Sequence, residues 1–289
     1  MHQCLRTSPF TALIHFNNLS LFTAGSLHNQ QAAADTHMRL DAVDLVAAAP
    51  RKSLALAGVA AICASLVLPA LRGPGASAVG PPPRDALRRP VLTEVEERLK
   101  LVRRSSAGVP CLEFLRASYA IISIFDALPG MGMVKSDMLG NCDKIWRHQT
   151  AEPRTLQQMC VAEIEALGGD ADQARKRDGS VCNSLLWLKR ALRLIDGILK
   201  GLVRDATASM RDCCTSAYAS SLKKYHNVVM RSAFGVAVNA APSRAEFMRK
   251  LAPASTEAAS LKTIGRLLAS FSTLLDAIEG FLKEKRIES

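Results

Sequence analysis

The chain has 289 residues, of which 48% are hydrophobic and 22% are charged. This length suits one or two domains with a sizeable core, and the composition excludes an intrinsically disordered polyelectrolyte. Aromatic residues make up only 5%, which argues against a large β-sandwich and suits helices packed through Leu, Ala and Met. The net charge of +11 is compatible with nucleic acid or an anionic membrane surface as partner. Because the charge is spread along the chain without a zinc or helix-turn-helix signature, we expect no nucleic-acid binding.

The eight cysteines form no C-x-x-C pair, and none has a histidine nearby at metal-ligand spacing. The adjacent Cys213 and Cys214 would face different directions on a helix and cannot easily join each other. We therefore expect reduced thiols that pack as small buried hydrophobes, with no disulfide framework, no metal and no cofactor.

The first 90 residues differ in composition from the rest of the chain. They divide into a transit-peptide-like stretch that we expect to be poorly ordered, a hydrophobic helix and a Pro-rich linker, at residues 1–52, 53–72 and 73–90. The hydrophobic helix is barely long enough to cross a bilayer and is either a signal or an anchor. Whether it is cleaved or retained is open at this stage, as is the choice between Met1 and Met38 as the start.

From residue 91 onward, hydrophobic residues recur at helical spacing in almost every segment, and no segment alternates with a period of two. Thr93 and Glu96 offer a capping box near the start, and Ser243 with Glu246 marks another helix start. The patterns predict helices near residues 92–102, 112–128, 134–148, 155–167, 182–207, 210–240, 243–251 and 261–282. The domain at residues 91–289 is therefore predicted to be all-α.

One predicted helix carries three polar side chains on a single face. Asp137, Asn141 and Lys144 follow the i, i+4, i+7 spacing that aligns residues along a helix. A carboxylate, an amide and an ammonium group together suit a polyhydroxylated or phosphorylated head group. The alternative is an exposed helix face whose Asp/Lys pair contributes little energy, and the spacing alone favours that alternative.

Two further positions stand out in the later helices. Trp187 shares a helix face with Ala191 and Leu194, so it belongs either to the core or to the floor of a pocket with a polar mouth. A separate charged stripe on the same helix is expected to be solvated, and its members are Lys189, Arg193, Asp196 and Lys200. His226 is a candidate hydrogen-bonding residue, although its spacing alone favours a structural histidine bonded to backbone.

Five motifs occur in order along nearly 200 residues of the chain. They are Asp137-Met-Leu-Gly140-Asn141-Cys-Asp-Lys144, Arg154-Thr155-Leu156-Gln157, Leu186-Trp187-Leu188-Lys189-Arg190, Leu222-Lys223-Lys224-Tyr225-His226 and Ala241-Pro242-Ser243-Arg244-x-x-Phe247. With these motifs, residues from about 91 to 285 resemble the glycolipid transfer protein family. The resemblance implies a two-layer helical sandwich of about eight helices, with a hydrophobic cavity between the layers for the two chains of a sphingolipid.

Members of that family shuttle lipids between membranes and are not enzymes, so the resemblance implies sphingolipid transfer with no catalytic residues. It also implies the role of each site residue. Asp137, Asn141 and Lys144 would bind the sugar, and Asp137 would accept a hydrogen bond from the ceramide amide. Trp187 would lie under the first sugar ring, and His226 would donate to the acyl carbonyl.

The head group is predicted from one departure within the family. Relatives that bind ceramide 1-phosphate carry arginines where this chain has Trp187 and Ala191, which favours a glycosphingolipid because phosphate prefers bidentate cationic donors. Ceramide 1-phosphate carried by the same fold, with Arg190 as a phosphate contact, is the first alternative. A membrane-tethered sensor that binds lipid without releasing it is the second.

Two other departures concern the membrane surface. Val228 stands where relatives often have a docking Trp, and residues 285–289 lack the aromatic ending that helps to close a glycolipid site. We therefore expect basic side chains to dock the protein on anionic lipid. We also expect a monomer that is cytoplasmic and peripheral to membranes, unless residues 53–72 anchor it or direct it to an organelle.

Overall fold

The computed structural model describes residues 89–150, 152 and 154–288. The predicted segments at residues 1–52 and 53–72, and nearly all of the linker at residues 73–90, lie outside the described residues. Among the helices that are described, none combines the length and the hydrophobicity needed to span a bilayer.

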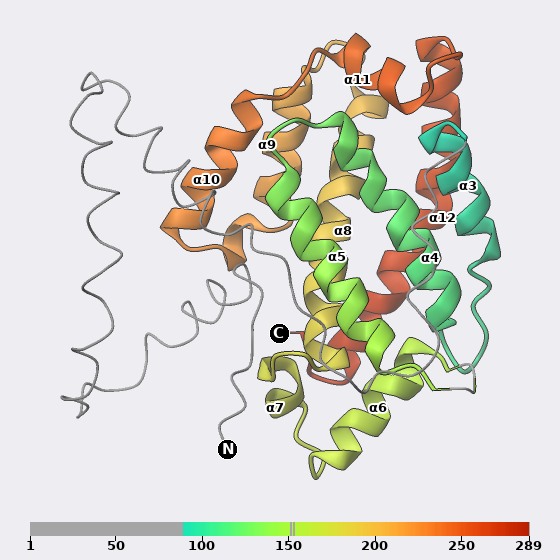
Figure 1. Ribbon diagram of the computed structural model, residues 1–289, viewed down its shortest axis with the longest axis vertical. Coiled ribbons are helices and arrows are strands. Elements are labelled where there is room, and N and C mark those ends of the chain that lie inside the picture. Colours follow the sequence, from blue (N-terminus) through green and yellow to red (C-terminus); the bar gives the residue numbers. More distant parts are fainter. Residues whose placement is uncertain (1–88, 151, 153, 289) are drawn as a thin grey trace, which may run out of the picture. The chain divides into compact units, whose positions relative to one another are not determined.

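The described part of the chain is all-α, as predicted, with ten α-helices and two short 3₁₀ helices. Figure 1 shows them in two layers, with α4 and α5 in front of α8 and α12. The helices are α3 (Val91–Leu101), α4 (Cys111–Ile122), η1 (Ser123–Ala127), α5 (Gly132–Arg147), α6 (Leu156–Ala166), α7 (Ala171–Lys176), α8 (Val181–Arg204), α9 (Met210–Ser220), η2 (Lys223–Tyr225), α10 (Val228–Asn239), α11 (Arg244–Leu251) and α12 (Glu257–Glu284). The short α7 falls in a segment for which the sequence pattern predicts no helix.

The single helix predicted over residues 210–240 is wrong, because α9 and α10 are separate helices with η2 between them. At the end of α9 the Ser221 hydroxyl donates to the carbonyl of Ala217 at 2.6 Å, which competes with continued helical bonding. Asn227 then caps α10 by accepting from the backbone N–H of Met230 at 2.9 Å. The break places Tyr225 and His226 in the connection between two helices.

Helix starts were predicted with mixed success. Ser243 caps α11 by accepting from the backbone N–H of Glu246, as predicted. The capping box predicted at Thr93 and Glu96 is wrong, because α3 begins at Val91 directly after Pro90. Proline suits that position since the first N–H groups of a helix have no intrahelical partner.

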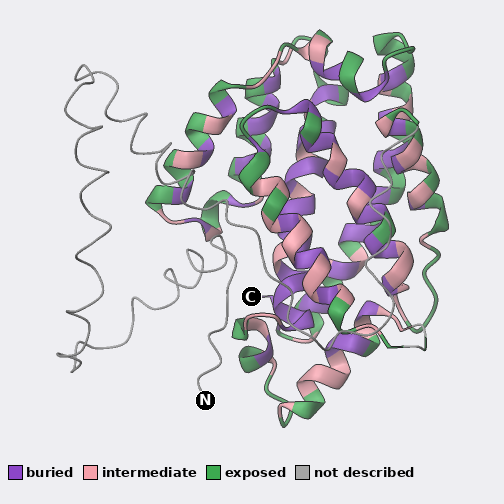
Figure 2. Ribbon diagram, viewed as in Figure 1, coloured by how far each residue is buried: buried purple, intermediate pink, exposed green. Residues whose placement is uncertain are grey.

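The long helix α8 lies at the centre of the domain and packs against α5, α9 and α12. It carries buried residues along its whole length, and Figure 2 shows buried residues concentrated on the inner helices. The approach to α9 is close: a Cβ added at Gly197 would lie 2.8 Å from the Cβ of Ala217. The predicted apolar stripe of α12 is confirmed, with Ile264, Phe271 and Ile278 all buried.

The six cysteines in the described residues are all buried, as predicted for small hydrophobic side chains. Burial raises the pKa of Cys111 and of Cys214 to about 12, so these thiols stay protonated and unreactive at neutral pH. Cys4 and Cys63 lie outside the described residues. Within the described part of the chain, no group of three His, Cys, Asp or Glu side chains is placed to hold a metal ion.

Candidate functional site

The polar face predicted on α5 is half-buried rather than exposed. Asn141 is 5% exposed, and its amide Nδ2 lies 3.2 Å from Oδ2 of Asp137 and 3.0 Å from the Asp137 carbonyl oxygen. The ammonium of Lys144 donates to Oδ1 of Asp178 at 2.6 Å. The i, i+4 spacing thus produces a side-chain contact, and the cluster lies at the edge of the apolar core.

The ionisation of Asp137 is set by its surroundings. Burial raises the pKa of this carboxyl to about 7, while the positive charge of Lys144 opposes the increase. At neutral pH the carboxyl therefore exists in both its ionised and its protonated forms. It can accept a hydrogen bond in the ionised form and donate one in the protonated form.

Trp187 on α8 is half-buried. It is therefore neither a fully buried core residue nor a fully exposed one, and the choice between core and pocket floor depends on its neighbours. Its ring meets the ring of Tyr225 edge-on, with centroids 6.2 Å apart and an interplanar angle of 77°. The guanidinium carbon of Arg190 lies 4.9 Å from the Trp187 ring centroid and 3.5 Å from the Tyr225 ring centroid. Arg190 therefore links the two aromatic rings through cation–π contacts.

His226 is buried, and its environment holds it neutral. Its Nδ1 lies 2.9 Å from the hydroxyl of Tyr218, whose ring stacks on Phe234 with centroids 3.8 Å apart. The favoured interpretation of a histidine bonded to backbone is wrong for this nitrogen, because its partner is a side chain. Burial, with a contribution from the positive charge of Arg231, lowers the pKa of His226 to about 4. When the Tyr218 hydroxyl donates to Nδ1, Nε2 carries the ring proton.

A cleft of about 310 Å³ lies between α8, α12 and the segment around Tyr225, which is the aromatic residue in its lining. The prediction that the charged stripe of α8 is solvated is wrong for two of its four residues, because Lys189 and Asp196 are each only 3% exposed. Lys189 donates to the carboxylate of Glu288, and the same carboxylate lies 3.3 Å from Nε of Arg190. The hydroxyl of Tyr225 also donates to it, at 3.3 Å.

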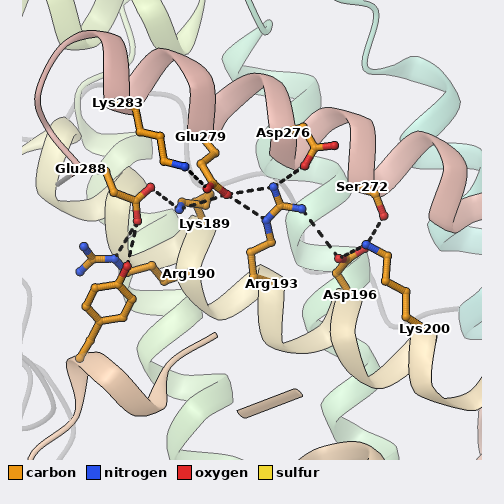
Figure 3. A network of polar contacts seen from close by, with 11 residues as sticks. Lys189, Arg190, Arg193, Asp196, Lys200, Ser272, Asp276, Glu279, Lys283 and Glu288 are labelled. Atoms are coloured by element: carbon orange, nitrogen blue, oxygen red, sulfur yellow. Dashed lines mark hydrogen bonds and ion pairs between the residues drawn. The ribbon is translucent and has the colours of Figure 1, made fainter. Parts of the chain in front are cut away.

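Further ion pairs continue from this cleft along α8. Arg193 pairs with Asp276 and Glu279 of α12 at 2.5 and 3.0 Å, and Asp196 pairs with Lys200 at 2.7 Å. Figure 3 shows these side chains of α8 facing the acidic side chains of α12. The network ties the two helices together. The Asp276 and Lys200 side chains are more than half exposed, so loss of a partner is costly mainly for the buried Asp196.

The structure also includes site residues that the sequence analysis missed. Lys189 is buried although it was predicted to be solvated. Leu185 and Leu192 lie on the same helix face, and this spacing indicates that apolar residues surround Lys189. Glu288 carried no such signal, because it lies 98 and 99 residues along the chain from its partners Arg190 and Lys189. Tyr225 was noted only as the neighbour of His226.

The packing of α5 against α8 determines how these polar and aromatic groups are arranged. Because α5 packs against α8, the Asp137 cluster and Trp187 lie on neighbouring helices. Arg190 then joins Trp187 to Tyr225 and to the cleft. The polar groups therefore form two clusters on adjacent helices: a carboxylate and an amide on α5, and aromatic faces with cationic donors along α8.

A family model described as "Glycolipid transfer protein (GLTP)" matches residues 109–253, which is half of the chain. The chain belongs to the glycolipid transfer protein family. This confirms the resemblance found in the sequence motifs, and the family is named for lipid transfer, not for a catalysed reaction.

Among curated family members, glycolipid transfer protein 1 of Arabidopsis thaliana is 28% identical over 196 residues, which cover 66% of this chain and 93% of that protein. Pleckstrin homology domain-containing family A member 8 of Rattus norvegicus is 33% identical over 150 residues, or 50% of this chain. The match spans only 28% of the length of that rat protein.

Solved structures agree on the fold of the glycolipid transfer protein family. The structure of human ceramide-1-phosphate transfer protein in complex with 2:0 ceramide-1-phosphate superposes on this chain with a TM-score of 0.62 and a sequence identity of 18%. The superposition covers 69% of this chain and 97% of that chain. At this identity the likeness establishes the shared architecture, and the choice of lipid depends on the residues of this chain.

Proposed function

We propose that this protein binds a sphingolipid between its helical layers and transfers it between membranes, with a glycosphingolipid as the preferred cargo. The observation that carries the proposal is the half-buried cluster of Asp137 and Asn141 on α5, on the helix next to the one that carries Trp187. The curated relative from Arabidopsis thaliana is named a glycolipid transfer protein, which supports the same conclusion. No step of this function requires a catalytic residue.

The apolar interior supplies affinity for the lipid chains without choosing the head group. Each methylene group removed from water contributes roughly 0.8 kcal/mol, so a two-chain lipid leaves a bilayer only for another apolar environment. The core of the described domain is one continuous apolar cluster that includes residues of α4, α5, α8 and α12. We propose that the lipid chains enter between these helices by displacing side-chain contacts. This burial has no direction, so the choice of lipid comes from polar groups at the edge.

The polar groups have complementary roles in this proposal. The ionised form of Asp137 accepts hydrogen bonds from sugar hydroxyls and from the ceramide amide, and Asn141 and Lys144 hold further hydroxyls. Trp187 offers a ring face to the first sugar, and neutral His226 donates to the acyl carbonyl. A lipid that leaves such buried groups unpaired loses about 1–3 kcal/mol for each group.

The outer surface of α10 is the proposed membrane contact. Val228, Val229 and Val236 are 75%, 64% and 54% exposed, an unusual concentration of apolar side chains on one short helix. The exposed Lys223 and Lys224 precede them in η2. Val228 stands where relatives often have a docking Trp, and in this proposal the exposed valines insert into the bilayer instead. The neighbouring lysines bind anionic lipid head groups.

Ceramide 1-phosphate is the second candidate cargo, and one observation favours it. Lys189 and Arg190 lie in the cleft that Tyr225 also lines, and Arg190 contacts the Trp187 ring. Cationic donors in such a position suit a phosphate. Both cations already pair with the Glu288 carboxylate, which is why the neutral glycolipid is the preferred candidate.

Transfer of fluorescent glucosylceramide between vesicles tests the proposal directly, and the absence of transfer for every sphingolipid tried would overturn it. The two tryptophans of the chain provide a matched pair for the site. In Trp146→Phe, Trp187 is the remaining tryptophan, and its emission should change when glucosylceramide vesicles are added. In Trp187→Phe, the remaining Trp146 should respond weakly, and transfer should decrease. Equal responses from both variants would contradict the placement of the sugar on Trp187.

A further inference from the structure

The residues that follow α12 form a turn that directs Glu288 into the cleft. Arg286 has a φ of 56°, in the left-handed region that side chains other than glycine seldom adopt. The backbone N–H groups of Ile287 and Glu288 both donate to the carbonyl of Leu282, at 2.8 and 3.0 Å. Ile287 is fully buried and fastens the turn to the core. Backbone strain is retained where surrounding contacts hold it in place, so this conformation is over-determined by the packing of the turn.

The carboxylate of Glu288 is buried and ionised. Its side chain is 4% exposed and has three donors around it, from Lys189, Arg190 and Tyr225. Burial would raise the pKa of Glu288, but the hydrogen bond from Lys189 and the charges of Lys189 and Arg190 outweigh it and hold the pKa below its ordinary value. The cleft therefore contains an anion supplied by the chain itself.

Arg190 depends on this anion more than its neighbours do. Arg193 pairs with Asp276 and Glu279, and Lys189 also lies 3.7 Å from Glu279. For Arg190, Glu288 is the one carboxylate partner within the described residues. Arg190 is 8% exposed, and its guanidinium also contacts two aromatic rings. Without Glu288 it would be a buried cation that requires another anion.

We propose that Lys189, Arg190 and Tyr225 form an anion subsite, and that Glu288 fills it and so excludes sphingolipids with a phosphate or sulfate head group. The inference rests on the proposed sphingolipid binding and names the residue that sets its selectivity. An oxyanion that entered the cleft beside Glu288 would meet a like charge at close range. Without that charge, the ammonium, the guanidinium and the phenol hydroxyl become donors to a tetrahedral oxyanion.

The test uses the full chain and the variants Glu288→Gln and Glu288→Ser. Glutamine keeps the shape of the side chain without its charge, and serine also opens space for an oxyanion. The matched control is Glu284→Gln, because the Glu284 side chain is 68% exposed and, within the described residues, forms an ion pair only with its neighbour Lys285. Vesicle transfer is measured for ceramide 1-phosphate and for glucosylceramide, and binding of inorganic phosphate is measured by calorimetry and by thermal unfolding.

Both Glu288 variants should transfer ceramide 1-phosphate about tenfold faster than the unchanged chain, since charge-assisted hydrogen bonds to phosphate become available. Transfer of glucosylceramide should show no comparable gain, and Glu284→Gln should behave as the unchanged chain does. Adding Arg190→Gln to Glu288→Gln should abolish the gain. Inorganic phosphate should raise the unfolding temperature of the Glu288 variants and not that of the unchanged chain. Each variant is compared with itself with and without phosphate, so the measurement remains valid for a variant of lowered stability.

The outcomes separate the two proposals. If the Glu288 variants show no phosphate-dependent stabilisation and no gain for ceramide 1-phosphate, the anion subsite is wrong even where glucosylceramide transfer is normal. Suppose that the Glu288 variants bind phosphate and transfer glucosylceramide, but transfer ceramide 1-phosphate no faster than the unchanged chain. The subsite then accepts a free ion, and the role proposed for Glu288 in lipid selectivity is wrong. If no sphingolipid is transferred by any form of the protein, the proposed function fails, and phosphate binding alone then decides whether the subsite exists.

Discussion

Changing the pH from 8 to 6 tests the role proposed for Asp137. With a pKa of about 7, the carboxyl is roughly nine-tenths ionised at pH 8 and about one-tenth ionised at pH 6. The proposed role requires the ionised form, because that form accepts hydrogen bonds from sugar hydroxyls and from the ceramide amide. Affinity for glucosylceramide should therefore decrease about tenfold between pH 8 and pH 6. His226, with its pKa lowered to about 4, stays neutral throughout this range and does not contribute to the change.

The assay is the emission of Trp187 in the Trp146→Phe chain, titrated with glucosylceramide vesicles at each pH. Asp137→Asn is the control, since an amide cannot ionise and should bind weakly with no pH dependence. A tenfold change that persists in Asp137→Asn would show that another group titrates. A flat profile in the chain that retains Asp137 would refute the requirement for its ionised form.

The same carboxyl should make folding stability depend on pH. Its folded pKa is raised from 3.8 to about 7, so the native state binds more protons than the unfolded chain between those values. The stability associated with the protonated carboxyl is present below about pH 4 and is lost as the pH rises through 7, by up to about 4 kcal/mol. Asp137→Asn should therefore raise the unfolding temperature at pH 8 and change it little at pH 4. Calorimetry at the two pH values would measure the difference.

Three further predictions concern packing, capping and docking. Gly197→Ala should destabilise the fold by about 1–3 kcal/mol, because its Cβ would lie 2.8 Å from that of Ala217, and Ala217→Gly should restore stability in chemical denaturation. Glu163→Ala should cost about 1–2 kcal/mol in the same assay, since its carboxylate accepts the first two backbone N–H groups of α8. Replacing Val228 and Val229 with Asp should lower vesicle sedimentation about tenfold with little change in unfolding temperature. A large change in unfolding temperature would instead indicate that these side chains stabilise the fold.

Features with a local cause were predictable from the sequence. The stripe of α12 and the shared face of Asp137 and Asn141 follow from helical periodicity, and the structure contains both. The family motifs added the two-layer arrangement, which periodicity alone does not specify. The break between α9 and α10 was missed although Asn227, a favoured capping residue, directly precedes the hydrophobic run that begins at Val228.

Features that depend on distant partners were not predictable in the same way. Apolar neighbours on its own helix face indicate that Lys189 is buried, but its ion-pair partner Glu288 lies 99 residues away and could not be identified from the helical pattern. The burial of Asp196 similarly depends on Ser272 of α12, whose hydroxyl donates to its carboxylate at 2.6 Å. Ion pairs of this kind require the tertiary fold, so helical periodicity alone cannot identify them.

The short connection between η2 and α10 affects the order of events at a bilayer. Val228, at the surface proposed to touch lipid, follows Tyr225, at the cleft, by three positions along the chain. Three residues of chain extend at most about 10 Å, so with α10 resting on the membrane a head group meets the cleft while its hydrocarbon chains are still among other lipids. In the proposed transfer reaction, an unsuitable lipid would therefore be rejected before it is extracted and would stay in its leaflet.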